Sequence, residues 1–102
     1  MRGLETMAEN QLKAISLEIE SFIHQRGLTH LYVMVHGKHM IIYSTYDGEK
    51  EPRARLSQIR PDVFRLSMAD HRGRWETTPY IGTTNKLLEM LLEEFGFALI
   101  DF

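Results

Sequence analysis

The feature that most constrains this chain is a pair of alternating segments separated by only two residues. The segments Leu28 to His36 and His39 to Tyr46 are rich in residues that favour β-strands. Gly37 and Lys38 stand between them, and glycine supplies the positive φ that a two-residue hairpin turn requires. Because the length of the turn fixes the strand register, the sequence predicts which side chains share a face of the sheet.

That register divides the hairpin into two faces. On the first face it pairs Val35 with Met40 and Val33 with Ile42. On the second face it pairs His36 with His39, Met34 with Ile41, and Tyr32 with Tyr43. The first face is wholly apolar, and we expect it to be buried.

A second hairpin is predicted from the segments Arg53 to Ile59 and Val63 to Ala69, joined through Arg60, Pro61 and Asp62. A three-residue loop collects apolar side chains on one face, whereas a two-residue loop would mix polar and apolar side chains on both. The apolar face then sets Ala54 beside Met68, Leu56 beside Leu66, and Gln58 beside Phe64. The opposite face carries Arg55, Ser57, Arg65 and Ser67. Between the two hairpins, we expect Asp47 to Pro52 to form an exposed loop.

A short fifth strand is predicted from Arg74 to Thr78, after a turn that runs from Asp70 to Gly73. This strand places Trp75 opposite Met68 on the core side of the sheet. Pro79 either ends the strand or confines it to an edge.

Helical periodicity marks both ends of the chain. From Met7 to Gln25 an apolar stripe recurs at helical spacing, formed by Leu12, Ile15, Ile19, Phe22 and Ile23. A second helix is predicted from Thr83 or Thr84 to Phe95, and Gly96 ends it. We expect the apolar tail from Phe97 to Phe102 to be either a final edge strand or a packed extension.

The chain is therefore predicted to be a single α+β domain over residues 1–102, an antiparallel meander of four or five strands with both helices packed on one face. Its composition, 43% hydrophobic and 25% charged, is that of an ordinary globular protein. The sequence holds no cysteine, which excludes disulfides, thiolate metal sites and a cysteine nucleophile. No apolar run is long enough to span a bilayer and the first residues lack a secretory signal, so we expect a cytoplasmic protein without membrane contact.

The face of the sheet left without a helix is the predicted functional surface. One half of it presents Tyr32, Met34, Ile41 and Tyr43, and the other half presents Arg55 and Arg65. An uncovered antiparallel face is normally polar, so an aromatic and aliphatic half indicates burial against a partner. Self-association as a homodimer is the leading hypothesis. The alternatives are cover by a segment of the same chain and binding of another protein or a ligand.

Binding of nucleic acid or another anionic ligand is the second hypothesis for the same face. Six arginines lie between Arg53 and Trp75, and Arg53, Arg72 and Arg74 are further candidates for anion contacts. The helix–sheet–helix order resembles the double-stranded RNA-binding domain at the level of topology. That family has a cluster of lysines at the start of its second helix, where this chain has only Lys86, and the net charge of -2 also disfavours nucleic acid.

Metal binding and catalysis find little support in the sequence. His36 and His39 are predicted cross-strand neighbours, but a zinc site needs three or four ligands. Ser67, Asp70 and His71 have the composition of a triad, yet an adjacent acid and base do not suit triad geometry, and no nucleophile-elbow motif is present. We therefore predict neither a metal, nor a cofactor, nor a catalytic residue.

Overall fold

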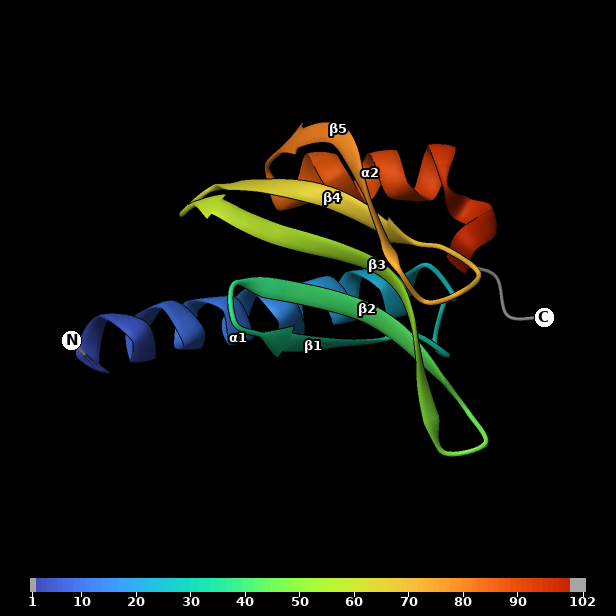
Figure 1. The fold of residues 1–102 in the computed structure, drawn as a ribbon, viewed down its shortest axis with the longest axis horizontal. Coiled ribbons are helices and arrows are strands. Elements are labelled where there is room, and N and C mark those ends of the chain that lie inside the picture. The colour runs from blue at the N-terminus through green and yellow to red at the C-terminus, as the bar shows by residue number, and fades with distance from the viewer. Residues whose placement is uncertain (1, 100–102) are drawn as a thin grey trace.

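The structure, a computed structural model, describes residues 2–99 of the chain, with side chains from residue 10 on and Phe97 excepted. It consists of two α-helices, a five-stranded antiparallel sheet and a short 3-10 helix (Figure 1). In chain order the elements are α1 (Arg2–Gln25), β1 (Tyr32–His36), β2 (His39–Tyr46), β3 (Glu49–Arg60), β4 (Val63–Ala69), β5 (Trp75–Gly82), α2 (Thr84–Glu94) and η1 (Gly96–Leu99). Each strand pairs with the next one along the chain, so the sheet is the predicted meander.

Both helices lie on one face of the sheet, with α1 beside β1 and α2 beside β4 and β5 (Figure 1). The core between the two layers is formed by buried side chains of both helices and of alternate strand positions. These side chains include Leu12, Ile19, Ile23, Leu87, Leu88 and Leu91 of the helices and Met40, Ile42, Ala54, Leu56, Phe64 and Leu66 of the strands. These strand positions are those that alternation assigned to the buried face, which confirms the predicted two-layer α+β fold.

Both predicted hairpin registers are confirmed, but the second loop is shorter than predicted. Only Pro61 and Asp62 form it, because Arg60 pairs with Val63, and a bulge between Gln58 and Arg60 keeps the predicted pairs. Strands β1 and β2 pair Tyr32 with Tyr43, Val33 with Ile42, Met34 with Ile41, Val35 with Met40, and His36 with His39. Strands β3 and β4 pair Ala54 with Met68, Leu56 with Leu66, and Gln58 with Phe64. The first turn is as tight as expected because Gly37 adopts a φ of 60°.

The segment from Asp47 to Pro52 is not the exposed loop that the sequence predicted. Only Asp47 and Gly48 form the turn, with φ angles of 52° and 80°, and the strands continue on both sides so that Tyr46 pairs with Glu49. Two consecutive positive φ angles at an Asp-Gly pair are typical of a type I′ hairpin turn. The prediction was wrong because it took the charged residues after the turn as evidence of a loop, whereas these residues are exposed on a strand.

The register of β5 differs from the prediction by one residue. Trp75 pairs with Ala69 and Glu76 pairs with Met68, so Trp75 lies on the face without helices and not in the core. The connecting loop runs from Asp70 to Arg74, one residue longer than the turn that the sequence predicted, and the backbone N–H of Asp70 donates to the carbonyl of Arg74 at 2.8 Å. A shift of one residue moves a side chain to the opposite face.

The two edge strands are shielded in different ways. On the β1 edge, the backbone N–H of Val33 donates to Oε2 of Glu20 in α1 at 2.9 Å. On the β5 edge, the strand runs past Pro79, and its pairing with β4 is interrupted by a bulge between Arg65 and Ser67. Helix cover, proline and bulges all hinder the addition of a further strand. The face of the sheet without helices, rather than its edges, is therefore where another molecule has access.

The ends of the helices and of β1 differ slightly from the prediction. Helix α1 begins at Arg2, earlier than predicted. Helix α2 starts as expected, with Thr83 as N-cap: its Oγ1 accepts from the backbone N–H of Lys86 at 3.2 Å. Strand β1 is shorter than predicted, because Leu28 to Leu31 forms a turn in which the N–H of Leu31 donates to the carbonyl of Leu28 at 3.3 Å.

The C-terminal tail packs as the 3-10 helix η1, up to Leu99, and forms no edge strand within the described residues. The side chain of Leu99 is fully buried, and its carbonyl lies 2.7 Å from Nε2 of His30. The carbonyl of Ala98 accepts a hydrogen bond from Nη1 of Arg53 at 3.1 Å. The rest of the predicted tail, residues 100–102, lies outside the described residues.

Candidate anion site on the open sheet face

The face of the sheet opposite the helices, called the open face below, holds the candidate site. Alternation and the observed registers place on it Tyr32, Met34 and His36 of β1, His39, Ile41 and Tyr43 of β2, Arg55 and Ser57 of β3, Arg65, Ser67 and Ala69 of β4, and Trp75, Thr77 and Ile81 of β5. The structure therefore brings all the residues predicted for an interface onto one surface. These are Tyr32, Met34, Ile41, Tyr43, Arg55 and Arg65.

The open face is basic, although the chain as a whole has a net charge of -2. Arg55 and Arg65 lie on the adjacent strands β3 and β4. Lys38 reaches the face from the β1–β2 turn and Lys50 from the start of β3. No Asp or Glu within residues 2–99 occupies one of the open-face positions defined above. Positive charge is thus concentrated where no helix lies, an arrangement that favours an anionic ligand.

A cavity of about 340 Å³ is found at the arginine end of the open face. It is lined by Lys38, His39, Arg55, Ser57, Gln58, Ile59, Arg65, Ser67 and Thr77. At its centre the pairing of β3 with β4 sets Arg55 opposite Ser67 and Ser57 opposite Arg65. Each long basic side chain therefore has a small hydroxyl side chain as its cross-strand neighbour, and the serines leave room beside the guanidinium groups.

The guanidinium groups of Arg55 and Arg65 are incompletely hydrogen-bonded. The Nε atom of each is buried and has no hydrogen-bond partner among the described residues. The guanidinium carbon of Arg55 lies 4.7 Å from the centre of the Trp75 ring, a cation–π contact that restrains the side chain. A buried donor without an acceptor costs about 1–3 kcal/mol. These two N–H groups are therefore the part of the face that gains most from an added acceptor.

His39 and Lys38 complete the cavity from the β1–β2 turn. Nδ1 of His39 lies 2.7 Å from Oγ of Ser57, a hydrogen bond in which either group can donate. The carbonyl of Lys38 accepts from the backbone N–H of Gln58 at 2.9 Å, which ties the turn to β3. Burial lowers the pKa of His39, and the nearby positive charges of Arg55 and Lys38 lower it further. The cavity thus already holds enough positive charge to oppose the protonation of its histidine.

At the tyrosine end of the open face, the side chains contact one another. The rings of Tyr32 and Tyr43 contact each other with centroids 5.8 Å apart. Nζ of Lys50 lies 5.2 Å from the centre of the Tyr43 ring and donates to the sulfur of Met34 at 3.6 Å. Ile41 is only 8% exposed, although no helix covers it. This half offers less free apolar surface than the sequence predicted, since Lys50 lies over part of it.

The three further arginines predicted to contact an anion lie away from the cavity. Nη2 and Nε of Arg53 donate to Oγ of Ser44 at 2.9 and 3.1 Å, because a bulge in the pairing of β2 with β3 turns Arg53 away from the open face. Arg72 and Arg74 lie in the exposed β4–β5 loop, where their backbone N–H groups donate to Oδ1 of Asp70 at 2.8 Å. These hydrogen bonds lower the pKa of Asp70, and the one from the backbone N–H of Arg74 has the largest effect. Asp70 therefore has the turn role expected for it.

The histidine pair lies where the sequence placed it. His36 and His39 face each other across the first hairpin. Over the described part of the chain, no three His, Cys, Asp or Glu side chains come close enough together to hold a metal ion. The Nδ1 atom of His39 is directed to Ser57 instead.

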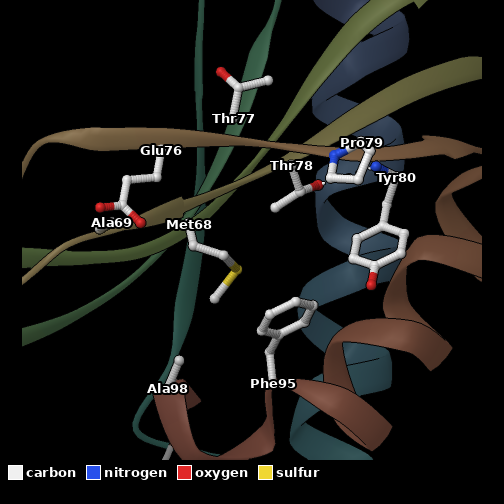
Figure 2. Close-up of a pocket in the computed structure, with 9 residues that line it drawn as sticks. All are labelled: Met68, Ala69, Glu76, Thr77, Thr78, Pro79, Tyr80, Phe95 and Ala98. Carbon is white, nitrogen blue, oxygen red and sulfur yellow. Dashed lines mark hydrogen bonds between the residues drawn. The ribbon is translucent and has the colours of Figure 1, made fainter.

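A second cavity, of about 480 Å³, lies on the helix side of β5. Figure 2 shows Met68, Tyr80 and Phe95 around a common space, with Ala98 of η1 below and Thr77 pointing away from it. The rings of Tyr80 and Phe95 meet edge to face, with centroids 5.9 Å apart. The lining of this second cavity is mainly apolar and includes no basic side chain. It therefore differs in chemistry from the cavity at the arginine end.

Sequence reasoning missed three members of the site. Lys38 and His39 were interpreted as parts of a turn and a histidine pair, and Trp75 was placed in the core. The signal for Lys38 and His39 was their place at the β1–β2 turn, which lies beside Ser57 once β2 pairs with β3. The signal for Trp75 was the run of arginines around it, which favours a cation–π contact.

The chain was compared with family models, with curated proteins and with solved structures, and none of them matches it.

No helix within the described residues has the length and apolar character needed to cross a membrane.

Proposed function

We propose that this chain is a non-catalytic binding module that holds an anionic ligand on its open sheet face. The observation that carries the proposal is the pair of buried, unpartnered Nε atoms of Arg55 and Arg65 in a cavity without a carboxylate.

The energetics favour a ligand over an empty site. Two guanidinium groups and one ammonium group share the lining of the cavity, so their mutual repulsion adds to the cost of the two unpaired donors. An oxyanion relieves both effects at once, because it accepts hydrogen bonds and supplies opposite charge. Hydrogen bonds between charged partners contribute about 1.5–3 kcal/mol each.

Self-association through the open face is the second candidate function. Tyr32 and Ile81, 40% and 43% exposed, favour it because they are large hydrophobic side chains on this surface. A two-fold dimer buries the same face of both copies, and none of the open-face positions defined above carries an Asp or Glu, so Arg55 and Arg65 would meet no opposite charge there. This lack of opposite charge places self-association behind anion binding.

Calorimetric titration with inorganic phosphate at constant ionic strength tests the leading proposal. We expect saturable binding by the wild-type chain. The affinity of the double variant Arg55→Gln/Arg65→Gln should be about 100-fold lower, since each of the two substitutions removes one or more charge-assisted hydrogen bonds. Affinity of the wild type should also fall as potassium chloride is added.

The matched control is Arg60→Gln/Arg72→Gln, which changes the net charge equally at two exposed positions outside the cavity. Its affinity for phosphate should stay within about twofold of the wild type, because exposed charges are screened by salt. If the control loses as much affinity as the test variant, binding is a general effect of charge and the proposed site is wrong. Absence of saturable phosphate binding by the wild type also contradicts the proposal.

Light scattering coupled to gel filtration tests the second candidate. A dimer that dissociates in the variant Tyr32→Glu/Tyr43→Glu, with an unchanged circular dichroism spectrum, supports self-association through the open face. A wild-type monomer, or a dimer that survives both substitutions, rejects it.

A further inference from the structure

The number of positive charges at the cavity narrows the kind of anion that fits. Arg55, Arg65 and Lys38 all line it, and the lining contains no Asp or Glu. A single carboxylate would leave most of this charge uncompensated. A phosphate monoester carries about -1.5 to -2 charges at neutral pH and matches the cavity better.

The elements that supply the hydrogen-bond donors also favour a tetrahedral anion. The guanidinium groups come from β3 and β4, Lys38 comes from the β1–β2 turn, and the hydroxyl of Thr77 comes from β5. Donors supplied by four different elements around one cavity suit the several oxygens of a phosphate group. The two oxygens of a planar carboxylate accept best within one plane, as in a bidentate contact with a single arginine.

Apolar side chains lie at the border of the same cavity. Ile59 lines it and is 48% exposed. Ile81 is 43% exposed and is the cross-strand neighbour of Arg65 on β5. The volume of about 340 Å³ lies at the lower end of the range for small-molecule sites. There is room for a phosphate group and for part of an organic group that contacts isoleucine.

We infer that the ligand of this site is a small phosphate monoester with an apolar organic group, the phosphate held by Arg55 and Arg65 and the organic group lying on Ile59. This inference rests on the proposed function and adds the class of ligand to it. A nucleic-acid strand fits less well, because Lys50 already lies over the Tyr43 ring on which a base would stack.

Titrations with phenyl phosphate, inorganic phosphate and benzoate at constant ionic strength test the inference. We expect phenyl phosphate to bind roughly threefold to tenfold more tightly than inorganic phosphate, because its ring removes apolar surface of Ile59 from water. Benzoate, which has the ring but a planar monoanion, should bind most weakly.

The variant Ile59→Ser separates the organic group from the phosphate. It should abolish the preference for phenyl phosphate over inorganic phosphate. Leu17→Ser, at an exposed leucine of α1 that does not line the cavity, is the matched control and should change neither affinity. Circular dichroism checks that both variants remain folded.

The outcomes distinguish this inference from the proposed function. If inorganic phosphate binds and phenyl phosphate binds no more tightly, the apolar part of the inference is wrong and the proposed function stands. If benzoate binds as tightly as phenyl phosphate, the site does not select phosphate. If an oligothymidylate without a terminal phosphate binds more tightly than phenyl phosphate, the ligand is a nucleic-acid backbone and the inference is overturned. If no phosphate compound binds, both proposals fail.

Discussion

Arg55 and Leu56 are neighbours on the central strand, and they show how differently the two faces of this sheet are built. Leu56 is fully buried under the helices, within a core to which both helices and the strands contribute. Arg55 points to the opposite side, where one nitrogen is buried without a hydrogen-bond partner. One face is complete within the chain, and the other keeps groups that an additional molecule would satisfy.

If the open face serves binding, as proposed above, its side chains need not contribute to stability. A protein that needed only to fold could place threonine or valine at Arg55 and Arg65 and avoid both the unpaired donors and the like charges. Functional sites commonly lower stability in this way, because the groups that bind a ligand are strained or repel one another without it. The following predictions test whether the two faces really separate stability from binding.

The largest expected effect is on the covered face. Leu56→Ala should lower the free energy of unfolding by about 2–5 kcal/mol, because it removes buried methyl groups and leaves a cavity under the helices. Urea denaturation measures this loss, and the phosphate affinity of the folded variant should remain within about twofold of the wild type. A large loss of affinity would show that the two faces are coupled.

A smaller effect is expected from the ring beside Arg55. Trp75→Leu should weaken phosphate binding about threefold to tenfold, because the guanidinium group loses the cation–π contact that restrains it. Trp75→Phe keeps an aromatic face and should restore most of the affinity in the same calorimetric titration. If leucine and phenylalanine behave alike, Trp75 does not position Arg55.

The arginines themselves should contribute little to stability in the absence of a ligand. Arg55→Gln/Arg65→Gln is expected to leave the free energy of unfolding unchanged or to raise it by up to about 1 kcal/mol, because it removes two unsatisfied buried donors and their repulsion. Urea denaturation in phosphate-free buffer measures the change. A clear loss of stability would mean that the arginines hold the fold together.

The pH dependence of binding should be modest, and its sign follows from His39. In the free protein, burial and the charges of Arg55 and Lys38 lower the pKa of His39, whereas a bound anion opposes these charges and raises it. The complex therefore binds more protons than the free protein, and affinity for sulfate should rise roughly twofold to fivefold as pH falls through the ordinary range of histidine. Sulfate is suitable because its own charge does not change there, and His39→Gln should abolish the effect.

The same lowered pKa sets the effect of pH on stability without a ligand. A group whose pKa is lower in the folded state than in the unfolded state favours unfolding once it becomes protonated. For His39, stability is therefore expected to fall as pH drops below the ordinary pKa of histidine. Addition of sulfate should reduce this fall.

Most of the fold could be predicted because two short turns fix the strand parity. Gly37 and Lys38 set the first register. In the second hairpin, a two-residue turn and a bulge at Ile59 give the same strand parity as the predicted three-residue loop, so Arg55 and Arg65 were correctly placed on one face. The prediction failed where the number of loop residues had to be guessed. One extra residue between Asp70 and Arg74 moves Trp75 to the open face.

Less of the candidate site could be predicted, since it depends on how the two hairpins pair with each other. The bulge between Ile42 and Tyr43 turns Arg53 away from Arg55, and alternation alone does not reveal a bulge. The pairing of His39 with Ser57 brings the β1–β2 turn to the arginines. It joins residues 18 positions apart. Its register follows from the Asp47–Gly48 turn together with the bulge, and the sequence predicted a loop in place of that turn.

The most direct measurement of the central claim is an NMR titration that observes the Nε–H groups of the arginine side chains while inorganic phosphate is added. The account predicts that the Nε–H resonances of Arg55 and Arg65 shift together, saturate with one dissociation constant, and become protected from exchange with water. The resonances of Arg60 and Arg72 should stay nearly unchanged. If all the arginine resonances shift alike and without saturation, or if those of Arg55 and Arg65 do not move, the open face holds no anion site.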